Sequence, residues 1–269
     1  IGEAPKIAMT IKLSSRVQAV KPSPTLAITA RAAALRAEGK DVIGLGAGEP
    51  DFDTPEHIKK AALKAIADGK TKYTAVDGTA TLKQAIIDKF RRDNGFEYAA
   101  DQILVSCGGK QSFYNLAQAI LDPGDEVIIP APYWVSYPDM SILAGGVPVL
   151  IHADAGQHFK MTPAQLRAAL TENTRLVVIN SPSNPTGMAY TSDELAALGE
   201  VLREHPKVVI ATDDMYEHIR WNTDVPFVNI LNACPDLANR TMVLNGVSKA
   251  YSMTGWRIGY AGGPAEVIK

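Results

Sequence analysis

The apolar and polar positions of this 269-residue chain form two successive patterns. In the first, Ser-Pro or Thr-Pro start signals and Gly stop signals delimit helices. The predicted helices with both signals span residues 23–39 and 54–69, and a third, marked only by its end before Gly95, spans residues 81–93. In the second, short apolar runs alternate with helical segments. Strands are predicted over residues 103–106, 126–130, 147–151, 176–179, 208–212, 242–244 and 258–261, with helices over 109–121, 134–143 and 191–205 and from 162 onward. Thr191 and Glu194 fit a capping box at the start of the helix over 191–205.

Several of these strands are continuous apolar runs, as expected when helices cover both faces of a sheet. Strands that alternate with helices in this way predict an α/β fold with a mostly parallel sheet. The chain shows no internal repeat and no low-complexity linker. In sheets of this kind, ligands bind in the loops at the carboxyl ends of the strands.

Composition narrows the classes of partner. The formal charge of −2 gives no basic footprint for nucleic acid and no polybasic membrane anchor. No apolar run approaches the length of a membrane span, and the N-terminal residues lack the blocks of a signal peptide. Cys107 and Cys234 form no CxxC, and the histidines have no metal-binding spacing. We therefore expect a soluble cytoplasmic protein without a metal, nucleic-acid or membrane partner.

Polar and Gly-rich clusters occur where four of the predicted strands end. Because the carboxyl ends of parallel strands share one sheet edge, these four loops are expected to face one site. The clusters are Gly108-Gly109-Lys110, Asn184-Pro185-Thr186-Gly187, Asp213 to Tyr216, and Ser248-Lys249.

Lys249 is the most informative of these residues. Small residues flank it, and Arg257 follows between an aromatic residue and a Gly turn. Desolvation and a nearby cation both disfavour the ammonium form, so the amine becomes nucleophilic near neutral pH. The guanidinium offers a planar fork for a phosphate. An amine for an aldehyde and an arginine for a phosphate together indicate pyridoxal phosphate (PLP).

Four other residues have both a functional and a structural interpretation. Asp213 could pair with a protonated pyridine nitrogen, and Tyr216 and Asn184 could bind the phenolic oxygen of the ring. Trp134 offers a flat face for stacking. The structural alternatives are a solvated turn, a turn before a proline, and a tryptophan of the core.

The glycines before Lys110 allow backbone N–H groups to approach an anion at a helix N-terminus. The alternative is a plain turn, because Gly-Gly before a helix is common. Neither this loop nor the Gly44–Gly48 stretch is a nucleotide-binding fingerprint.

Together these loops resemble the fold-type I PLP enzymes, and specifically the class I aminotransferases. The most specific match is Gly246-x-Ser248-Lys249-x-x-Ser252-Met253-x-Gly255-x-Arg257-Ile258-Gly259. The resemblance begins near Val17 and is strongest to the bacterial aspartate aminotransferases of subgroup Iβ, some of which also use prephenate. Further matches are Asn180-Ser181-Pro182-Ser183-Asn184-Pro185-Thr186-Gly187, Asp213-Asp214-Met215-Tyr216, Gly46-Ala47-Gly48-Glu49-Pro50-Asp51-Phe52, Thr71-Lys72-Tyr73 and Gly108-Gly109-Lys110-Gln111.

The resemblance implies a role for each matching residue. Lys249 would bond to the cofactor aldehyde and then shuttle the substrate proton. Asp213 would hold the pyridinium nitrogen, and Arg257 would bind the phosphate together with backbone amides. Tyr73 would reach the phosphate of a partner subunit, which makes a homodimer necessary for a complete site. The implied cofactor-binding set is Lys249, Gly109, Lys110, Trp134, Asn184, Asp213, Tyr216, Ser248, Arg257 and Tyr73.

The resemblance also implies a substrate-binding set. Ser23, Thr25 and Lys110 correspond to the group that binds a distal carboxylate, and Lys21 corresponds to a position tied to prephenate use. The full implied set is Gly48, Trp134, Asn184, Ser23, Thr25, Lys110 and Lys21.

Family members continue well beyond the equivalent of Lys269 and there supply the arginine that binds the substrate α-carboxylate. We therefore expect a small domain that is incomplete in this chain. Residues 1–48 would be its N-terminal part, and residues 49–269 would be the large PLP-binding domain. The N-terminal part is expected to be poorly supported.

The implied activity is transfer of an amino group between L-aspartate or L-glutamate and 2-oxo acids, namely 2-oxoglutarate, oxaloacetate and, as a further candidate, prephenate. A PLP enzyme of the β-lyase type would use the same anchors without the distal-carboxylate group. A non-catalytic PLP-binding module of a transcription regulator is a third interpretation. We expect no such module here, because the residues printed before Ser23 are fewer than the DNA-binding domain of these regulators needs.

Overall fold

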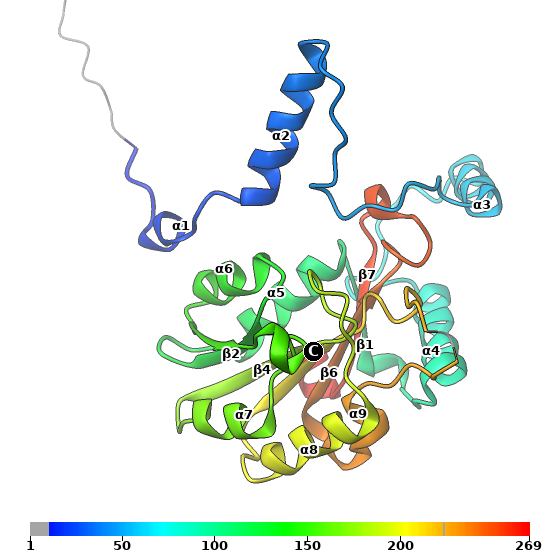
Figure 1. Ribbon diagram of the computed structural model, residues 1–269. Coiled ribbons are helices and arrows are strands. Elements are labelled where there is room, and N and C mark those ends of the chain that lie inside the picture. The colour runs from blue at the N-terminus through cyan, green and yellow to red at the C-terminus, as the bar shows by residue number, and fades with distance from the viewer. Residues whose placement is uncertain (1–10, 223) are drawn as a thin grey trace, which may run out of the picture.

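The computed structural model describes residues 11–222 and 224–269. Its centre is a seven-stranded sheet with helices on both faces (Figure 1). From one edge to the other the strand order is β1-β7-β6-β5-β4-β2-β3. The strands are β1 (Ile103–Ser106), β2 (Glu126–Ala131), β3 (Val147–His152), β4 (Thr174–Asn180), β5 (Val209–Asp213), β6 (Thr241–Gly246) and β7 (Gly259–Gly262).

One strand of this sheet runs against the others. β7 pairs antiparallel with both of its neighbours, β1 and β6. The remaining pairs, β6 with β5, β5 with β4, β4 with β2 and β2 with β3, are parallel. The predicted α/β fold with a mostly parallel sheet is confirmed.

Successive strand residues point to opposite faces and build two apolar cores. Val177 and Ile210 belong to the first core, and their neighbours Leu176 and Ala211 belong to the second. Because both faces are covered, the strands read as continuous apolar runs. The helices of the first face are α4 (Ala80–Asn94), α7 (Pro163–Ala169), α8 (Ser192–Arg203) and α9 (Ile230–Ala233), and those of the second are α5 (Gly109–Ile120) and α6 (Ser136–Leu143).

Several helix ends follow the predicted capping chemistry. At α8, the Glu194 amide donates to Thr191 Oγ1 at 3.2 Å and the Thr191 amide donates to Glu194 Oε2 at 2.7 Å. At the end of α4, Gly95 has the left-handed conformation, with φ of 75°. Single-turn elements were not predicted, because one turn leaves no periodic pattern. They include α1 (Ser15–Ala19), α9 and α10 (Ala265–Ile268).

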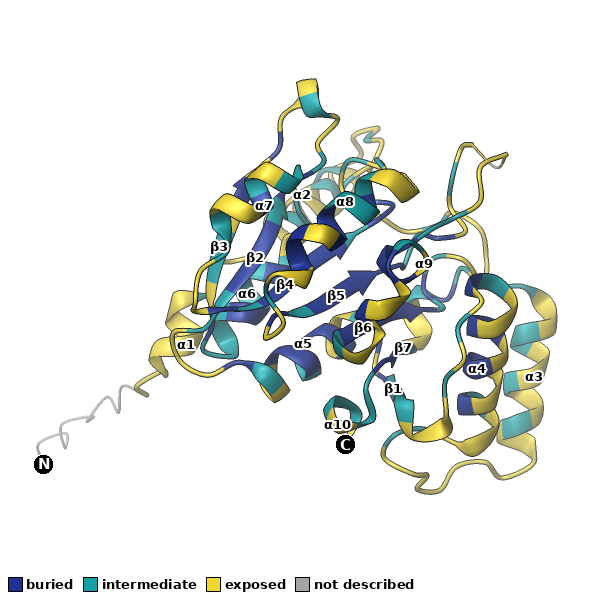
Figure 2. Ribbon diagram, turned by 90° about the horizontal axis from the view of Figure 1, so that it is seen from below, coloured by how far each residue is buried: buried dark blue, intermediate teal, exposed yellow. Residues whose placement is uncertain are grey.

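Residues 11–78, here called the N-terminal arm, differ from the sheet body of residues 79–269. The arm holds α1, α2 (Pro24–Ala37) and α3 (Glu56–Ala67), and it extends away from the sheet as the blue and cyan helices of Figure 1. None of these three helices has a buried residue, whereas α4 carries a buried stripe (Figure 2). Lys83 is the first buried residue in the described part of the chain.

The start of α3 differs from its prediction. Pro55, not Thr54, stands at the N-cap, without a side-chain hydrogen bond to the helix. The Thr54 hydroxyl instead donates to the carbonyl of Ser252 at 2.5 Å and accepts from the Trp256 indole N–H at 2.9 Å. The Thr-Pro signal was therefore wrong about the cap, because a contact with a distant loop takes up the hydroxyl. No helix in the described residues is both long and apolar enough for a membrane span.

Candidate active site

Four loops at the carboxyl edge of the sheet enclose a cavity of about 520 Å³. They follow β1, β4, β5 and β6, as the sequence predicted. The arm closes part of the cavity through Thr25 and through residues 45–48. The predicted residues that line it are Gly48, Thr25, Gly109, Lys110, Trp134, Asn184, Asp213, Tyr216, Ser248, Lys249 and Arg257.

Lys249 lies in a turn that follows β6, and its side chain is half-buried. Its Nζ donates a hydrogen bond to the carbonyl of Gly48 in the arm, and lies 6.0 Å from the centre of the Tyr216 ring. Burial lowers the pKa of the Lys249 amine; the Glu49 carboxylate opposes this shift and the Arg257 guanidinium adds to it. A lowered pKa increases the fraction of neutral amine, the form that attacks a carbonyl carbon.

Asp213 is the buried anion of the cavity. Its Oδ2 accepts from the Tyr137 hydroxyl at 2.5 Å, and its Oδ1 accepts from the Met215 amide at 3.2 Å. Burial raises the pKa of the Asp213 carboxyl, while these two donors counteract part of the increase. A cation placed beside this carboxyl would favour its ionised form, so the position suits a protonated ring nitrogen.

Tyr137 is a site residue that the sequence analysis missed. It is 2% exposed, packs edge-on against Trp134 with ring centres 5.2 Å apart, and donates to Asp213. Burial, together with the Asp213 carboxylate, raises the pKa of Tyr137 well above its ordinary value, so it stays a donor. The only sequence signal was an aromatic residue one helical turn after Trp134, which is equally typical of a core position.

Asn184 and Tyr216 meet across the cavity. The Asn184 side-chain amide donates to the Tyr216 hydroxyl at 3.4 Å, and the Asn184 backbone amide donates to Asn180 Oδ1 at 2.7 Å. Asn180, at the end of β4, in turn donates to the Asp213 carbonyl at 2.9 Å. The loops after β4 and β5 are therefore fixed to each other, with two polar side chains presented toward the same point.

The loop after β1 approaches Arg257 closely. A Cβ atom on Gly108 would lie 2.3 Å from Arg257 Nη2, and one on Gly259 would lie 2.3 Å from the Gly108 carbonyl carbon. Only glycine allows this approach, which brings the guanidinium beside the N-terminus of α5, where amides already favour an anion. Arg257 itself donates to the Thr254 carbonyl at 2.7 Å. Lys110 adds a second cation, 5.2 Å from the centre of the Trp134 ring.

Three predicted residues do not line this cavity. Tyr73 is fully exposed, Lys21 is exposed, and Ser23 caps α2 by accepting from the Leu26 amide at 3.4 Å. A helix cap is the ordinary use of a serine before a proline. The arm instead reaches the Lys249 loop through Thr54 and through Glu49, which accepts from the Thr254 hydroxyl.

The donor set matches one kind of ligand. The cavity combines an amine with a lowered pKa, a buried carboxylate, a flat indole face and a guanidinium beside a helix N-terminus. These groups complement an aldehyde, a ring nitrogen that carries a proton, an aromatic ring and a phosphate, respectively. The residues present therefore fit pyridoxal phosphate.

Residues 40–269 match the model of the aminotransferase class I and II family. The chain belongs to this family. The aspartate/prephenate aminotransferase of Nitrosomonas europaea is 67% identical over 258 residues, which are 96% of this chain and 65% of that protein. The aspartate aminotransferase of Geobacillus stearothermophilus is 54% identical and covers the same shares, 96% and 65%.

Solved structures of aminotransferases agree with this family assignment. The aspartate aminotransferase of Rhizobium meliloti superposes with a TM-score of 0.92 at 55% identity, over 96% of this chain and 64% of that one. The Thermus thermophilus aspartate aminotransferase with maleate gives a TM-score of 0.91 at 47% identity, over 96% and 66%. The chain therefore spans about two thirds of the length of these relatives.

Proposed function

We propose that the whole protein is a PLP-dependent aspartate aminotransferase that moves an amino group between L-aspartate or L-glutamate and 2-oxo acids. One observation carries the proposal: the amine of Lys249 and the buried carboxylate of Asp213 line the same cavity. Arg257 and the N-terminus of α5, which together favour a bound anion, line it as well. The names of the aminotransferase relatives support the choice of substrate, and the aspartate/prephenate enzymes among them make prephenate a further candidate.

When bound, the cofactor supplies an electron sink, and the residues of the chain bind it, orient it and move the proton. Lys249 is the group that moves the proton on and off the substrate carbon, because its amine is desolvated and its pKa is lowered. Asp213 would keep the ring nitrogen protonated, while the Tyr137 hydroxyl holds the Asp213 carboxylate in place. Asn184 and Tyr216 would bind the phenolic oxygen, and Arg257 would bind the phosphate with Ser248 and the amides of Gly109 and Lys110.

The distal carboxylate of a dicarboxylic substrate is assigned to Thr25 and Lys110. Both residues line the cavity, and the Lys110 ammonium lies 5.2 Å from the centre of the Trp134 ring. Ser23 and Lys21 would join this group only if the arm moved, because neither lines the cavity in this structure. An arm that moves toward the sheet body on substrate binding would also exclude water from the reaction.

A homodimer is part of the proposal. Tyr73 is fully exposed and lies outside the cavity of its own chain, so its hydroxyl is free to reach the phosphate of a partner subunit. We assign residues 1–48 to a small domain and residues 49–269 to a large one. We also place the protein in the cytoplasm, because both cysteines are free, as is usual in a reducing compartment.

The decisive experiment is a visible absorption spectrum of the whole protein, taken on one sample before and after borohydride and on a separate, unreduced sample before and after aspartate. The expected result is a PLP band that borohydride fixes to Lys249 and that aspartate converts. Lys249→Ala should abolish the fixed adduct and lower transamination at least about 10³-fold, because it removes both the nucleophile and the proton carrier.

The matched control is Lys207→Ala, an exposed lysine of the sheet body, which should keep the band and the activity. Elimination of a β-substituent without amino-group transfer would identify a β-lyase instead. A protein that carries no PLP band with Lys249 intact would refute the proposal.

A further inference from the structure

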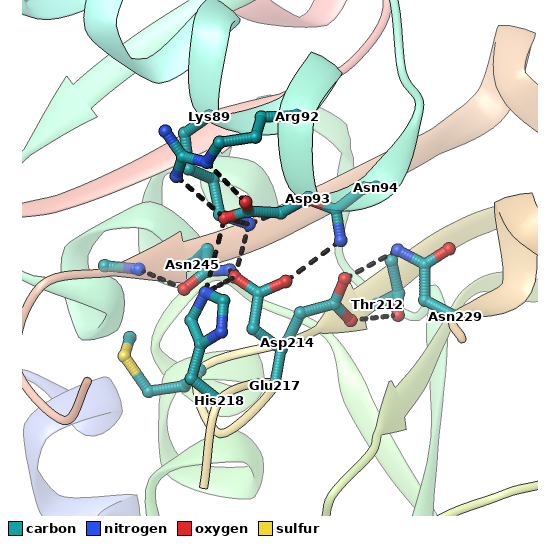
Figure 3. A network of polar contacts seen from close by, with 12 residues as sticks. Lys89, Arg92, Asp93, Asn94, Thr212, Asp214, Glu217, His218, Asn229 and Asn245 are labelled. Atoms are coloured by element: carbon teal, nitrogen blue, oxygen red, sulfur yellow. Dashed lines mark hydrogen bonds and ion pairs between the residues drawn. The ribbon is translucent and has the colours of Figure 1, made fainter. Parts of the chain in front are cut away.

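A buried polar network lies behind the loop that follows β5 (Figure 3). Glu217, which is 3% exposed, is at its centre. Its Oε2 accepts from Asn94 Nδ2 at 2.9 Å, its Oε1 accepts from Asn245 Nδ2 at 2.7 Å, and the Lys89 ammonium pairs with that same Oε1. Lys89 is 7% exposed and also donates to Asn94 Oδ1 at 2.8 Å. The buried charge is therefore both neutralised and hydrogen-bonded.

The network connects two loops that carry residues of the cavity. Glu217 directly follows Tyr216, which lines the cavity. Asn245 lies in β6, and the chain then turns within a few residues to Lys249. The hydrogen bond between Glu217 and Asn245 thus connects the loop that carries Tyr216 to the strand that leads to Lys249.

This bond begins where the sheet ends. Pairing of β5 with β6 stops at Asp213 and Leu244, and the Asp214 amide donates to the Leu244 carbonyl at 2.9 Å. Beyond that point, the Glu217 carboxylate holds the side chain of Asn245, by the hydrogen bond from Asn245 Nδ2 to Glu217 Oε1. The other side of Asn245 is held by β7, where it pairs with Tyr260. Removal of the Glu217 carboxylate would remove this side-chain tie between the two loops.

The same cluster has a second interpretation, as a metal site. Asp93, Glu217 and His218 each offer an oxygen or nitrogen atom within 4.8 Å of the others. The Lys89 ammonium already pairs with Glu217 and lies 3.9 Å from Asp93 Oδ2. A cation of the chain therefore occupies the position that a metal ion would need, and the cluster is an ion-pair network.

We propose that Glu217 is a positioning residue of the cofactor site, which sets the separation of the Tyr216 ring from the Lys249 amine by holding Asn245. The inference rests on the proposed function. Glu217 does not line the cavity. Its carboxylate acts through the hydrogen bond to Asn245, which joins the two loops.

A double-mutant cycle tests this role in the whole protein, with Glu217→Ala, Asn245→Ala and the double variant. Each single change should weaken the affinity for pyridoxal phosphate about tenfold, and the double change should weaken it no further than about twofold beyond the worse single one. This non-additivity is expected because both changes remove the same hydrogen bond. The affinity is measured by absorbance titration of cofactor-free protein.

A second readout is independent of the cofactor. In cofactor-free protein, the pH dependence of Lys249 acetylation, followed by mass spectrometry, reports the pKa of that amine. Glu217→Ala and Asn245→Ala should shift the acetylation midpoint upward, because looser loops admit water and reduce the desolvation that lowers the pKa of Lys249.

Arg240→Met is the matched control for loss of stability. The Arg240 guanidinium donates to three carbonyls next to the opposite end of β6, including those of Leu202 and Val208 at 2.7 Å. It should lower the melting temperature yet leave the cofactor affinity within about twofold and the Lys249 midpoint unchanged.

Three outcomes would overturn the inference: additive losses in the cycle, unchanged affinity and midpoint in both single variants, or an equal loss of affinity in the Arg240→Met control. If Glu217→Ala does not fold, Asn245→Ala alone decides through the same two readouts. Failure of the proposed function looks different, since the wild-type protein would then form no borohydride-stable adduct on Lys249.

Discussion

The helices α3 and α4 show how differently the two regions of this chain are held. Both were predicted from the sequence, α3 from a Thr-Pro start and a Gly stop and α4 from a helical run that ends before a Gly, and both form. In α4, Ile86, Ile87 and Phe90 are buried against the sheet, whereas in α3 Leu63 and Ile66 remain about two-thirds exposed, at 66% and 65%. A helical pattern therefore predicts the helix but not what it packs against.

The sheet body has its own apolar core, whereas the three helices of the N-terminal arm bury no residue. The position of the arm therefore depends on its contacts with the sheet body. Polar contacts tie it to the body: Glu49, Thr54 and Gly48 bind the loop of Lys249, and at the other end of the arm the Asp77 carbonyl accepts from the Val105 amide at 3.0 Å. The chemical groups of the site are therefore fixed by the rigid region, while its closure depends on the looser one.

The largest contrast is expected between Phe90→Ala in α4 and Leu63→Ala in α3. Phe90 is fully buried and touches Tyr98 and Tyr260 edge-on, so its truncation should cost about 3–5 kcal/mol of unfolding free energy. Leu63 is mostly exposed, so its truncation should change the unfolding free energy of the sheet body by less than about 0.5 kcal/mol. Urea unfolding at low protein concentration measures both. Similar costs for the two variants would show that α3 packs on its own chain.

The free energy of unfolding of the sheet body should depend on pH, because the sheet body contains buried ionisable groups such as Asp214. Burial raises the pKa of Asp214 to about 7, although Thr212 and Asn229 donate hydrogen bonds to it. The native state then binds a proton that the unfolded state releases. Stability from this group is complete below about pH 4 and is lost as the pH rises toward 7, by at most about 1.4 kcal/mol per pH unit.

Asp214→Asn should remove this contribution, so that the variant gains stability relative to wild type as the pH rises from 4 to 7. Urea unfolding at several pH values gives the difference. Glu172→Gln, at an exposed position, controls for the loss of one negative charge. A difference between Asp214→Asn and wild type that is constant over this pH range would contradict the assignment.

The smallest effect is expected at the link between arm and body. Thr54→Val removes the hydroxyl that joins Ser252 and Trp256, at a cost of about 1 kcal/mol of arm docking. Hydrogen exchange in residues 48–56 should accelerate several-fold while exchange in β4 and β5 stays unchanged. Thr71→Val, an exposed threonine of the same arm, should leave both unchanged. Equal acceleration in the strands would mean that the arm and the body unfold together.

Much of the sheet body was predictable because its signals are local. Apolar runs placed the strands from Ile103 onward within one or two residues, and Thr191 with Glu194 marked a helix start that the structure confirms. The loops that line the cavity could be predicted as well, since parallel strands present their carboxyl ends along one edge.

The missed features depend on contacts between distant residues. Tyr137 and Asp213 are 76 positions apart, and Asn94 and Glu217 are 123 positions apart. No periodicity marks a tyrosine that donates to a buried carboxylate, or an asparagine that supports a loop from another element. The prediction for Thr54 failed for the same reason, because its partner Ser252 is 198 positions away.

The reversed strand β7 has a consequence for how this site can vary. Because β6 and β7 run in opposite directions, residues 247–258 leave the sheet and return to it at neighbouring positions. At this neck Gly246 lies opposite Gly259, and the Val247 amide donates to the Ile258 carbonyl at 3.3 Å. Lys249 and Arg257 stand at the two sides of that neck. The tip of this excursion can therefore change in length or sequence among related chains without pulling the amine and the guanidinium apart.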